Sequence, residues 1–422
     1  MNRSFDIAPA DCIFGENRPR LKILILAHRV PFPQNGGYPI VVYNTIKGLV
    51  NLGHEVSLVA LNSKKNYHEQ PEDDILSKIN YRVYNIDTSV SVFDVAVNLF
   101  SKTSFNIDKY YDSEFERLLV REVRANNYDI VQFDGLMVSL YLNAVRKNCS
   151  SKIVYRAHNI ENQVWQRLAG QKNDPFKKSY LKMHARRIKN FEVEQLNKVD
   201  SIIVFTGQDK TTMLSYGIKT PVDVLPVGIN LEQYQPDYTK TEVPSLFFLG
   251  SLDWLPNREG IEWFLENFHK ELTSGDLPVK FYVAGNDIPE RFDDYEVMGK
   301  IFIPGEVDNA LEFVNSKSIM IVPLLSSGGV RVKIVEGMAM EKCIISTSLG
   351  AEGINFTDGK NILIANNADE FYEAIKHCIT DEEFCRNIGL NARKLVEQQH
   401  DINVVTARLF NVYEQLQPAR LN

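Results

Sequence analysis

Short apolar runs alternate with longer amphipathic segments along most of the chain, and this alternation starts again in its second half. In the first half the apolar runs lie at residues 21–27, 56–61, 129–133, 152–156 and 201–205. In the second half they lie at residues 245–250, 279–285, 300–305, 319–324 and 342–347. Strands that alternate with helices form βαβ units, whose strands run parallel. The sequence therefore predicts an α/β fold with two Rossmann-like, doubly wound parallel-sheet domains. Because ligands of such sheets bind beyond the carboxyl ends of the strands, we expect the two domains to face an interdomain cleft.

The length of 422 residues also favours two domains, because single hydrophobic cores rarely grow beyond about 250–300 residues. A polar stretch with Pro236 and Pro244 interrupts the alternation, and we place an interdomain linker there. The expected parts are an N-terminal extension at 1–20, an N-terminal domain at 21–231, a linker at 232–244, a C-terminal domain at 245–402 and a C-terminal helix at 403–422. We expect this last helix to pack back on the N-terminal domain.

The composition excludes several classes of protein. A net charge of −7 argues against a general nucleic-acid binder, which usually carries a basic face. The five cysteines have irregular spacings without a C-x-x-C pair, so the sequence indicates neither a zinc site nor a disulfide framework. The first twenty residues lack the apolar core of a secretory signal, and no apolar run is long enough to span a membrane. A cytoplasmic protein is the expectation.

A first glycine-containing loop, PQNGGYP, follows the apolar run at 21–27 and precedes a helical pattern. Gly36 and Gly37 allow close approach of the backbone to a ligand, and the unpaired N–H groups at the start of a helix suit an anion. His28 ends the same apolar run and would lie on the ligand side of the sheet. A flexible connection without a ligand is the alternative interpretation.

A second loop, SSGGVRVKIVEGMAM at 326–340, carries a stronger signal. Gly328 and Gly329 let a phosphate reach backbone amides, and the helix dipole favours a negative charge at that point. Arg331 and Lys333 oppose the dipole in the first turns of the helix unless an anion lies between them. Glu336 is three residues after Lys333 and shares its helical face. A cation for phosphate and a carboxylate for ribose hydroxyls could thus line one pocket, or the two could form a solvated pair.

The segment SGGVRVKIVEGMAMEKCIISTSLGAEGI resembles the donor-site signature of family 4 retaining glycosyltransferases of the GT-B fold. Further segments resemble the family in the same order: LVNLGHEVSLV, HNIE, VDSIIVFTGQD, VLPVGINLEQYQP and LFFLGSLDWLPNREG. The resemblance extends over residues 20–415. It implies a C-terminal domain that binds a nucleotide sugar, with UDP or GDP as the nucleotide, and an N-terminal domain on the acceptor side.

The resemblance also implies roles for particular residues. Glu336 matches the second glutamate of the family's E-x(7)-E motif, which hydrogen-bonds the ribose, and His158 matches a histidine near the donor sugar. The expected donor-binding residues are Gly36, Gly37, Ser251, Gly328, Gly329, Val330, Arg331, Lys333 and Glu336. The expected catalytic residues are His158, Arg331 and Lys333. From the residues alone, a structural cap at a strand end remains the alternative for His158.

Two positions depart from the family's pattern. Gly328 stands where the first glutamate of E-x(7)-E would fall, and Ser251 stands where an arginine often follows the first glycine of the C-terminal domain. A branch of the family that reads G-G-x-R-x-K-x-x-E shows the same pattern. Arg331 is therefore expected to replace the missing arginine.

The expected activity is the transfer of a sugar from a nucleoside-diphosphate sugar to a hydroxyl of a glycan or lipid-linked saccharide, with retention of configuration. No metal and no cofactor is expected, because the sequence lacks the D-x-D motif with which metal-dependent GT-A enzymes hold Mn²⁺ or Mg²⁺. It also lacks G-x-x-x-x-G-K-[ST], G-x-S-x-G and H-E-x-x-H. A nucleotide-sugar epimerase and a non-catalytic binding partner of the same fold are the alternatives.

The segment Phe176–Asn190 is basic and amphipathic, and one interpretation is that it contacts a membrane. Basic amphipathic helices bind anionic membranes that bear lipid-linked acceptors, which would place the protein at the inner face of the cell membrane. A structural helix with a solvated basic face is the preferred interpretation of this segment.

Overall fold

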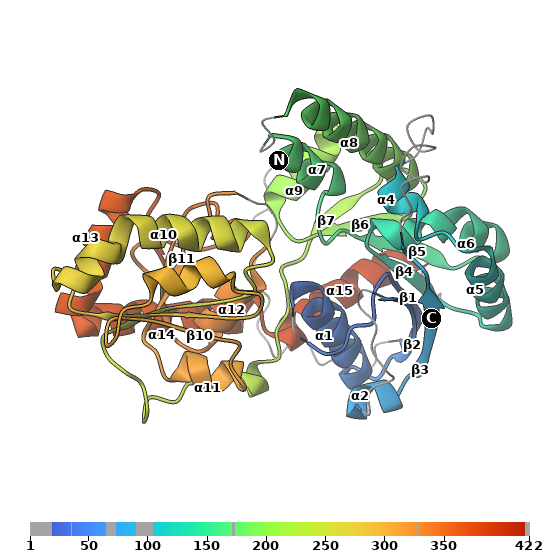
Figure 1. Ribbon diagram of the computed structural model, residues 1–422. Helices are drawn as coiled ribbons and strands as arrows, with labels where there is room; N and C mark the ends of the chain where they lie inside the picture. The colour runs from blue at the N-terminus through green and yellow to red at the C-terminus, as the bar shows by residue number, and fades with distance from the viewer. Residues whose placement is uncertain are drawn as a thin grey trace. The chain divides into compact units, whose positions relative to one another are not determined.

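The computed structural model describes residues 19–34, 36–64, 73–89, 104–170, 174–326 and 330–417, and the chain divides into two compact units (Figure 1). Unit 1 comprises Met1–Gly228 together with Ile402–Asn422, and unit 2 comprises Ile229–Asp401. Each unit contains one sheet in which every pair of neighbouring strands is parallel. The two doubly wound parallel-sheet domains expected from the alternating pattern are therefore confirmed.

Unit 1 is built on a seven-stranded sheet of order β3-β2-β1-β4-β5-β6-β7. Its strands are β1 Lys22–Ala27, β2 Glu55–Ser63, β3 Asn80–Ile86, β4 Ile130–Asp134, β5 Lys152–Arg156, β6 Ser201–Val204 and β7 Val222–Val224. Its helices are α1 Gly37–Asn51, α2 Asp74–Ser77, α4 Phe105–Asp108, α5 Ser113–Ala125, the 3-10 helix η3 Leu136–Tyr141, α6 Leu142–Asn148, α7 Glu161–Gly170, α8 Pro175–Leu196, α9 Gly207–Ser215 and α15 Ile402–Leu416.

The central strand β1 shows how the sheet of unit 1 is covered on both faces. Successive side chains of a strand point to opposite faces. Leu24 and Leu26 pack into one apolar cluster with residues of α5 and α6, whereas Ile23 and Ile25 pack into a second cluster with residues of α1 and α15. Burial on both faces explains why β1 reads as an unbroken apolar run rather than as an alternating one.

The C-terminal helix α15 is part of unit 1 and packs against α1. The ring of Phe410 stacks on His54 with centroids 4.9 Å apart. The hydroxyl of the fully buried Tyr413 donates a hydrogen bond to Oε1 of Gln132 in β4. The end of the chain thus supplies part of the core under the first domain's sheet.

Unit 2 is built on a six-stranded sheet of order β10-β9-β8-β11-β12-β13. Its strands are β8 Ser245–Leu249, β9 Lys280–Ala284, β10 Ile301–Gly305, β11 Ile319–Val322, β12 Cys343–Ser346 and β13 Leu363–Ile364. Its helices are the 3-10 helices η4 Leu231–Gln233 and η5 Glu290–Tyr295, and α10 Leu255–Ser274, α11 Ala310–Asn315, α12 Val332–Ala339, α13 Ala368–Thr380 and α14 Glu382–Gln399.

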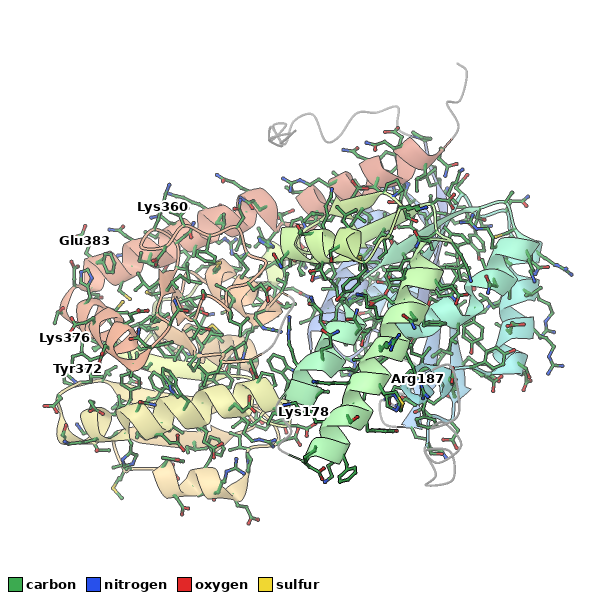
Figure 2. The ribbon with its side chains drawn as sticks, turned by 90° about the horizontal axis from the view of Figure 1, so that it is seen from above. Lys178, Arg187, Lys360, Tyr372, Lys376 and Glu383 are labelled. Atoms are coloured by element: carbon green, nitrogen blue, oxygen red, sulfur yellow. The ribbon has the colours of Figure 1, made fainter. Side chains whose placement is uncertain are left out.

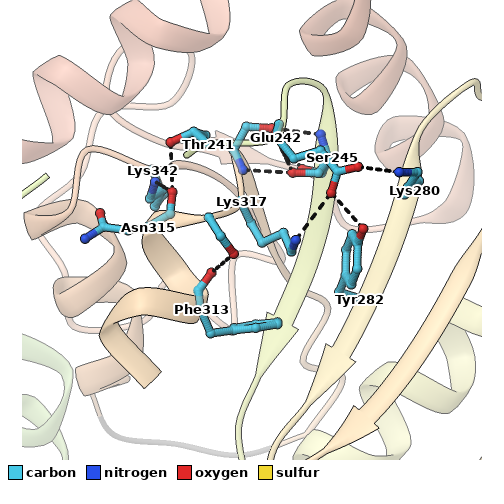
Figure 3. A network of polar contacts seen from close by, with 11 residues as sticks. Thr241, Glu242, Ser245, Lys280, Tyr282, Phe313, Asn315, Lys317 and Lys342 are labelled. Atoms are coloured by element: carbon cyan, nitrogen blue, oxygen red, sulfur yellow. Dashed lines mark hydrogen bonds and ion pairs between the residues drawn. The ribbon is translucent and has the colours of Figure 1, made fainter. Parts of the chain in front are cut away.

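A polar network fixes the start of β8 within unit 2 (Figure 3). The carboxylate of Glu242 accepts hydrogen bonds from Lys280 Nζ at 2.7 Å, from the hydroxyl of Tyr282 at 2.7 Å and from Lys317 Nζ at 3.3 Å. Thr241 Oγ1 donates to the carbonyl oxygen of Asn315 at 2.8 Å. These bonds tie the segment that precedes β8 to two other elements, strand β9 and the end of helix α11. They therefore fix the position at which β8 enters the sheet.

Close backbone packing brings α10 against the loop that follows β11. A Cβ added at Gly260 would lie 2.3 Å from the carbonyl oxygen of Pro323, far inside van der Waals contact. Glycine is therefore required at this helical position for steric reasons, although it is a poor helix former.

We predict that Gly260→Ala lowers the melting temperature of the protein, because the overlap with Pro323 costs about 1–3 kcal/mol and outweighs the gain of about 1 kcal/mol in helix propensity. Gly207→Ala in α9 is the matched control, because no atom lies within 4 Å of its added Cβ. Thermal unfolding followed by circular dichroism measures both. An unchanged or higher melting temperature for Gly260→Ala would contradict the packing described above.

Candidate functional site

In unit 2 the candidate residues gather at the carboxyl edge of the sheet. Gly250 and Ser251 directly follow β8, and the loop after β11 leads into α12, which carries Lys333 and Glu336. Since β8 and β11 are neighbours, both loops leave the sheet side by side. Gly328 and Gly329 of the predicted phosphate loop lie outside the described residues; Val330, two residues before the start of α12, is partly buried.

Lys333 is held by neutral groups. Its Nζ donates to Oδ1 of Asn257 at 2.8 Å and lies 4.1 Å from the centroid of the Phe248 ring. A Cβ at Gly250 would lie 3.1 Å from this Nζ, so glycine leaves room for the ammonium group. Burial, followed by the nearby charge of Arg331, lowers the pKa of Lys333 to about 7. An anion placed here would restore the charged form of the lysine.

Arg331 is the N-cap residue of α12, and its guanidinium carbon lies 4.7 Å from the centroid of the Trp254 ring. Trp254 is in turn the N-cap residue of α10 and is partly exposed. This contact with an aromatic ring helps to hold the planar guanidinium in place. Two cations, Arg331 and Lys333, therefore stand at the start of one helix, as the sequence spacing predicted.

Glu336 lies on α12 one turn after Lys333 and is hydrogen-bonded to Tyr234. The Tyr234 hydroxyl donates to Glu336 Oε1 at 2.6 Å. Burial raises the pKa of Glu336, while the bond from Tyr234 and the charge of Lys333 act in the opposite direction. Glu336 was a candidate from its spacing on the helix, whereas Tyr234, 102 residues away in the sequence, has no local signal that points to it.

Ser251, in the position of the family's arginine, has a local structural role. Its carbonyl oxygen accepts from Asn257 Nδ2 at 2.8 Å, and its hydroxyl donates to Asp287 Oδ2 at 3.2 Å. Asn257 thus joins the Ser251 backbone to the Lys333 ammonium group. The loop after β8 and the helix α12 are therefore connected through one amide side chain.

In unit 1 a buried ion pair occupies the carboxyl edge of the sheet. Asp134 is the last residue of β4, and Arg156 is the last residue of the neighbouring β5. Arg156 Nε donates to Asp134 Oδ1 at 2.6 Å, and Arg156 Nη2 donates to Asp134 Oδ2 at 2.9 Å. Burial alone would raise the pKa of Asp134, but Arg156 and His158 outweigh it and hold this pKa well below its usual value. Sequence reasoning missed both residues, because each ends an apolar strand and carries no motif.

His158 is oriented by this ion pair. Its Nε2 lies 2.8 Å from Asp134 Oδ1. Burial lowers the pKa of His158, and the Asp134 carboxylate partly opposes this shift. A neutral imidazole that donates its Nε2–H to a carboxylate leaves Nδ1 as a hydrogen-bond acceptor. His158 can therefore accept a proton or a hydrogen bond at Nδ1.

The first glycine loop contributes Tyr38 to the same cluster. The Tyr38 hydroxyl donates to the carbonyl oxygen of Asp134 at 3.2 Å, and the ring lies 4.4 Å from that of His158. His28 Nδ1 lies 3.2 Å from the same carbonyl oxygen, and burial lowers the pKa of His28 to about 4. Gly36 is the N-cap residue of α1, and Gly37 is its first residue, with open space around a Cβ at Gly36.

Two glutamates follow His158 in the chain, the partly buried Glu161 and the buried Glu192. Glu161 begins α7, and its backbone N–H donates to Oε1 of Glu192 in α8 at 3.2 Å. Asn162 Nδ2 donates to the other oxygen of Glu192 at 2.9 Å. Burial raises the pKa of both glutamates to about 7, and the negative charge of Glu192 adds to the shift at Glu161. Each carboxyl therefore keeps its proton up to about pH 7 in the folded protein.

Among the described residues, three cysteines form a group that could hold a metal ion. The sulfur atoms of Cys343, Cys378 and Cys385 all lie within 4.8 Å of one another. The cysteine spacing in the sequence indicated no such site, because the three residues come from β12, α13 and α14. They belong to the apolar core of unit 2 rather than to the edge with Lys333. No helix in the described part of the chain is both long and apolar enough to cross a membrane.

Models of two protein domains match the chain. Residues 35–233 match "Glycosyltransferase Family 4", and residues 243–381 match "Glycosyl transferases group 1". A Klebsiella pneumoniae relative, an uncharacterized 44.6 kDa protein in the cps region, is 23% identical over 400 residues, which cover 92% of this chain and 99% of the relative. The capsular polysaccharide biosynthesis glycosyltransferase CapM of Staphylococcus aureus is 25% identical over 222 residues, which cover 49% of this chain and 56% of CapM.

Solved structures share the fold. Sucrose-phosphate synthase from Thermosynechococcus elongatus superposes with a TM-score of 0.70 at 15% identity, covering 94% of this chain and 99% of that one. HepE of Anabaena, solved in complex with UDP-glucose, superposes with a TM-score of 0.65 at 12% identity, covering 94% of this chain and 100% of HepE. Both similarities extend over both units.

We predict that Glu161→Gln raises the melting temperature at pH 8 and flattens its dependence on pH. The folded-state pKa of about 7 lies above the ordinary value of 4.5, so this group contributes stability below pH 4.5 that is lost as the pH rises through 7. Glutamine mimics the protonated form at every pH. The exposed Glu194→Gln on α8 is the control, and equal pH profiles for wild type and Glu161→Gln would refute the assignment.

Proposed function

Because this chain is a glycosyltransferase of the GT-B fold, we propose that it transfers a sugar from a nucleoside-diphosphate sugar to a hydroxyl of a glycan or lipid-linked saccharide. The observation that carries the proposal is the combination on α12 of two cations, Arg331 and Lys333, with the carboxylate of Glu336. A diphosphate needs cations, and a ribose needs a hydrogen-bond acceptor. The UDP-glucose complex of HepE supports a UDP-sugar as the donor, with a GDP-sugar as the other candidate.

Lys333 and Arg331 suit a diphosphate that gains charge during the reaction. The pKa of Lys333, lowered to about 7, means that the bare site tends to lose this charge near neutral pH, and a bound diphosphate would draw the proton back. As the bond between the anomeric carbon and the diphosphate lengthens, negative charge accumulates on the leaving group. Cations placed there in advance stabilise the transition state more than the bound donor.

The proposed mechanism needs neither a metal ion nor a protein nucleophile. Arg331 and Lys333 take the role that a divalent cation has in metal-dependent transferases. The departing phosphate accepts the proton of the acceptor hydroxyl, and the new bond forms with retention of configuration. In unit 1 His158, held by Asp134, offers Nδ1 as an acceptor for a hydroxyl of the donor sugar.

We place the reaction in the cytoplasm, with α8 as the surface that contacts the inner face of the cell membrane. Lys177, Lys182 and Arg186 are exposed on α8, and Phe176 near its start is 87% exposed. Exposed basic and aromatic residues on one helix favour an anionic lipid surface, where a lipid-linked acceptor would lie. The buried face of the same helix, with His184 and Ile188, packs within unit 1.

The donor can be identified by a thermal-shift screen with UDP, GDP, ADP and TDP. A nucleotide at about a hundred times its dissociation constant stabilises a protein by about 2.7 kcal/mol. We expect Glu336→Ala to abolish most of the shift and Glu336→Gln to abolish part of it, because glutamine keeps one acceptor oxygen. Equal shifts in wild type and both variants would exclude Glu336 from the nucleotide site, and no shift with any nucleotide would contradict the proposed donor class.

We predict that Arg331→Ala and Lys333→Ala each lower kcat by about 10²–10³, with a smaller change in the KM of the donor. Arg331→Lys should recover only part of the activity, because an ammonium group cannot repeat the two-pronged contact of a guanidinium. Lys360→Ala, which removes an exposed lysine of the same unit (Figure 2), is the control. Steady-state kinetics with the identified donor measure these effects, and normal turnover in both alanine variants would remove the two cations from the reaction.

We predict that transfer proceeds without added divalent cations and survives treatment with EDTA, since two protein cations are proposed to neutralise the diphosphate. The rate of nucleoside-diphosphate release is measured before and after treatment, and again after addition of Mg²⁺ or Mn²⁺. Activity that is lost with EDTA and restored specifically by Mg²⁺ or Mn²⁺ would show that the leaving group depends on a metal ion.

A further inference from the structure

Glu336 is fixed from one side by a buried tyrosine. Tyr234 directly follows the 3-10 helix η4, is 8% exposed, and donates from its hydroxyl to Glu336 Oε1 at 2.6 Å. Within the part of the chain that the structure describes, no hydrogen bond to Oε2 of Glu336 is recorded. One oxygen of the carboxylate is therefore held, and the other remains able to accept a hydrogen bond from a ligand.

Arg393 on α14 holds the backbone on both sides of this contact. Its Nη1 donates to the carbonyl oxygen of Tyr234 at 2.6 Å and to the carbonyl oxygen of Ala339 at 2.5 Å. Ala339 is the last residue of α12, the helix that carries Glu336. A cation at the C-terminal end of a helix is also favoured by the helix dipole. Arg393 thus fastens Tyr234 to the helix that bears the carboxylate.

We infer that Tyr234, anchored by Arg393, is a positioning residue that turns Glu336 toward the ribose hydroxyls and so makes nucleotide binding depend on them. This inference rests on the proposed nucleotide-sugar function. A carboxylate with one oxygen already bonded cannot rotate to find another partner. A bound ligand that lacks the matching hydroxyl would cover this oxygen without a hydrogen bond to it, which is how sites built for a hydroxyl reject its deoxy analogue.

The test compares ribose discrimination in wild type and Tyr234→Phe. Calorimetry gives dissociation constants for UDP, 2′-deoxy-UDP and 3′-deoxy-UDP, with the GDP series in parallel. We expect wild type to prefer the ribonucleotide over one deoxy analogue by at least tenfold, and Tyr234→Phe to reduce this preference several-fold while it still binds the deoxy analogue as wild type does. Tyr238→Phe is the matched control, because it removes a tyrosine hydroxyl that donates to another glutamate, Glu341.

The outcomes separate this inference from the proposed function. If wild type discriminates and Tyr234→Phe discriminates equally well, Tyr234 has only a structural role and the inference is overturned. If UDP and GDP bind but neither variant nor wild type distinguishes the deoxy analogues, Glu336 does not contact the ribose and the inference also fails. If none of UDP, GDP, ADP and TDP binds to wild type, the proposed function itself falls. Phenylalanine keeps the apolar ring, and circular dichroism verifies that the variant is folded.

A second and independent observation concerns the three cysteines in the core of unit 2. Cys343 begins β12, Cys378 lies in the last turn of α13, and Cys385 lies in the first turn of α14. Their exposed fractions are 2%, 3% and 9%, and Cys343 Sγ lies 3.7 Å from Cys378 Sγ. Two thiolates that share a tetrahedral Zn²⁺ at about 2.3 Å from each sulfur lie about 3.8 Å apart. The distance between Cys343 Sγ and Cys378 Sγ matches that of two ligands to one ion, and the sulfur of Cys385 lies within 4.8 Å of both.

We propose that these three thiols form a structural site for a soft metal ion such as Zn²⁺, separate from the donor site. Binding would release the thiol protons and link β12, α13 and α14 through the ion, without any change of redox state. Simple apolar packing of buried cysteines is the competing explanation.

The test uses a Cys12→Ser, Cys149→Ser background, so that only these three cysteines remain. The reduced protein is titrated with Zn²⁺ and, separately, with Cd²⁺, whose thiolate bonds give an ultraviolet charge-transfer band. We expect one equivalent of either ion per chain, a rise in melting temperature with Zn²⁺, and loss of both effects when Cys385→Ser is added. Absence of stoichiometric binding, or binding that Cys385→Ser leaves unchanged, would show that the cysteines only fill the core.

Discussion

Parallel strands end at the same edge of a sheet, and the positions of all candidate residues depend on this constraint. In unit 1, Asp134 pairs in register with Arg156 of the next strand and with Ala27 on its other side. The loop after β1 therefore brings Tyr38 and His28 to the backbone carbonyl oxygen of the same Asp134. In unit 2, the neighbouring ends of β8 and β11 bring Gly250 and α12 together in the same way. Residues that are a hundred positions apart become neighbours because hydrogen-bonded strands point in one direction.

The two clusters differ in how they balance buried charge. Asp134 meets a guanidinium through two hydrogen bonds and a histidine through a third, so the carboxylate is compensated within the protein. Separating the partners of such a pair would leave an uncompensated buried charge, which costs free energy. The side chains of this cluster are therefore held in one arrangement. Lys333 instead rests on an amide oxygen and an aromatic face, and burial lowers its pKa to about 7. The compensated Asp134 cluster is suited to orienting a side chain such as His158. The Lys333 site, which has no compensating carboxylate bonded to it among the described residues, is suited to binding an anion.

The sequence predicted those parts of the fold that have strong local signals. Strands such as β1, buried on both faces, read as apolar runs, and the helix after the second glycine loop was placed correctly. Strands β3 and β7 were missed, because β3 is only half-buried and β7 has three residues. Arg331, Lys333 and Glu336 could be found from spacing on one helix. Their neighbours Asn257 and Tyr234, like the Asp134–Arg156 pair, meet only through tertiary packing, which no local pattern in one sequence encodes.

The connection between the two units has a consequence for the order in which the protein can be assembled. Unit 2 is a continuous insertion between Gly228 and Ile402, and its two ends lie side by side, with the Ile229 N–H donating to the carbonyl oxygen of His400 at 2.8 Å. On the ribosome, all of unit 2 emerges before α15 is made. Until α15 is made, one apolar face of the unit 1 sheet, around Ile23 and Ile25, is therefore covered only in part, by α1. Unit 2, whose two ends already lie side by side, can complete its core first. It can therefore finish folding before unit 1, although most of unit 1 is synthesised earlier.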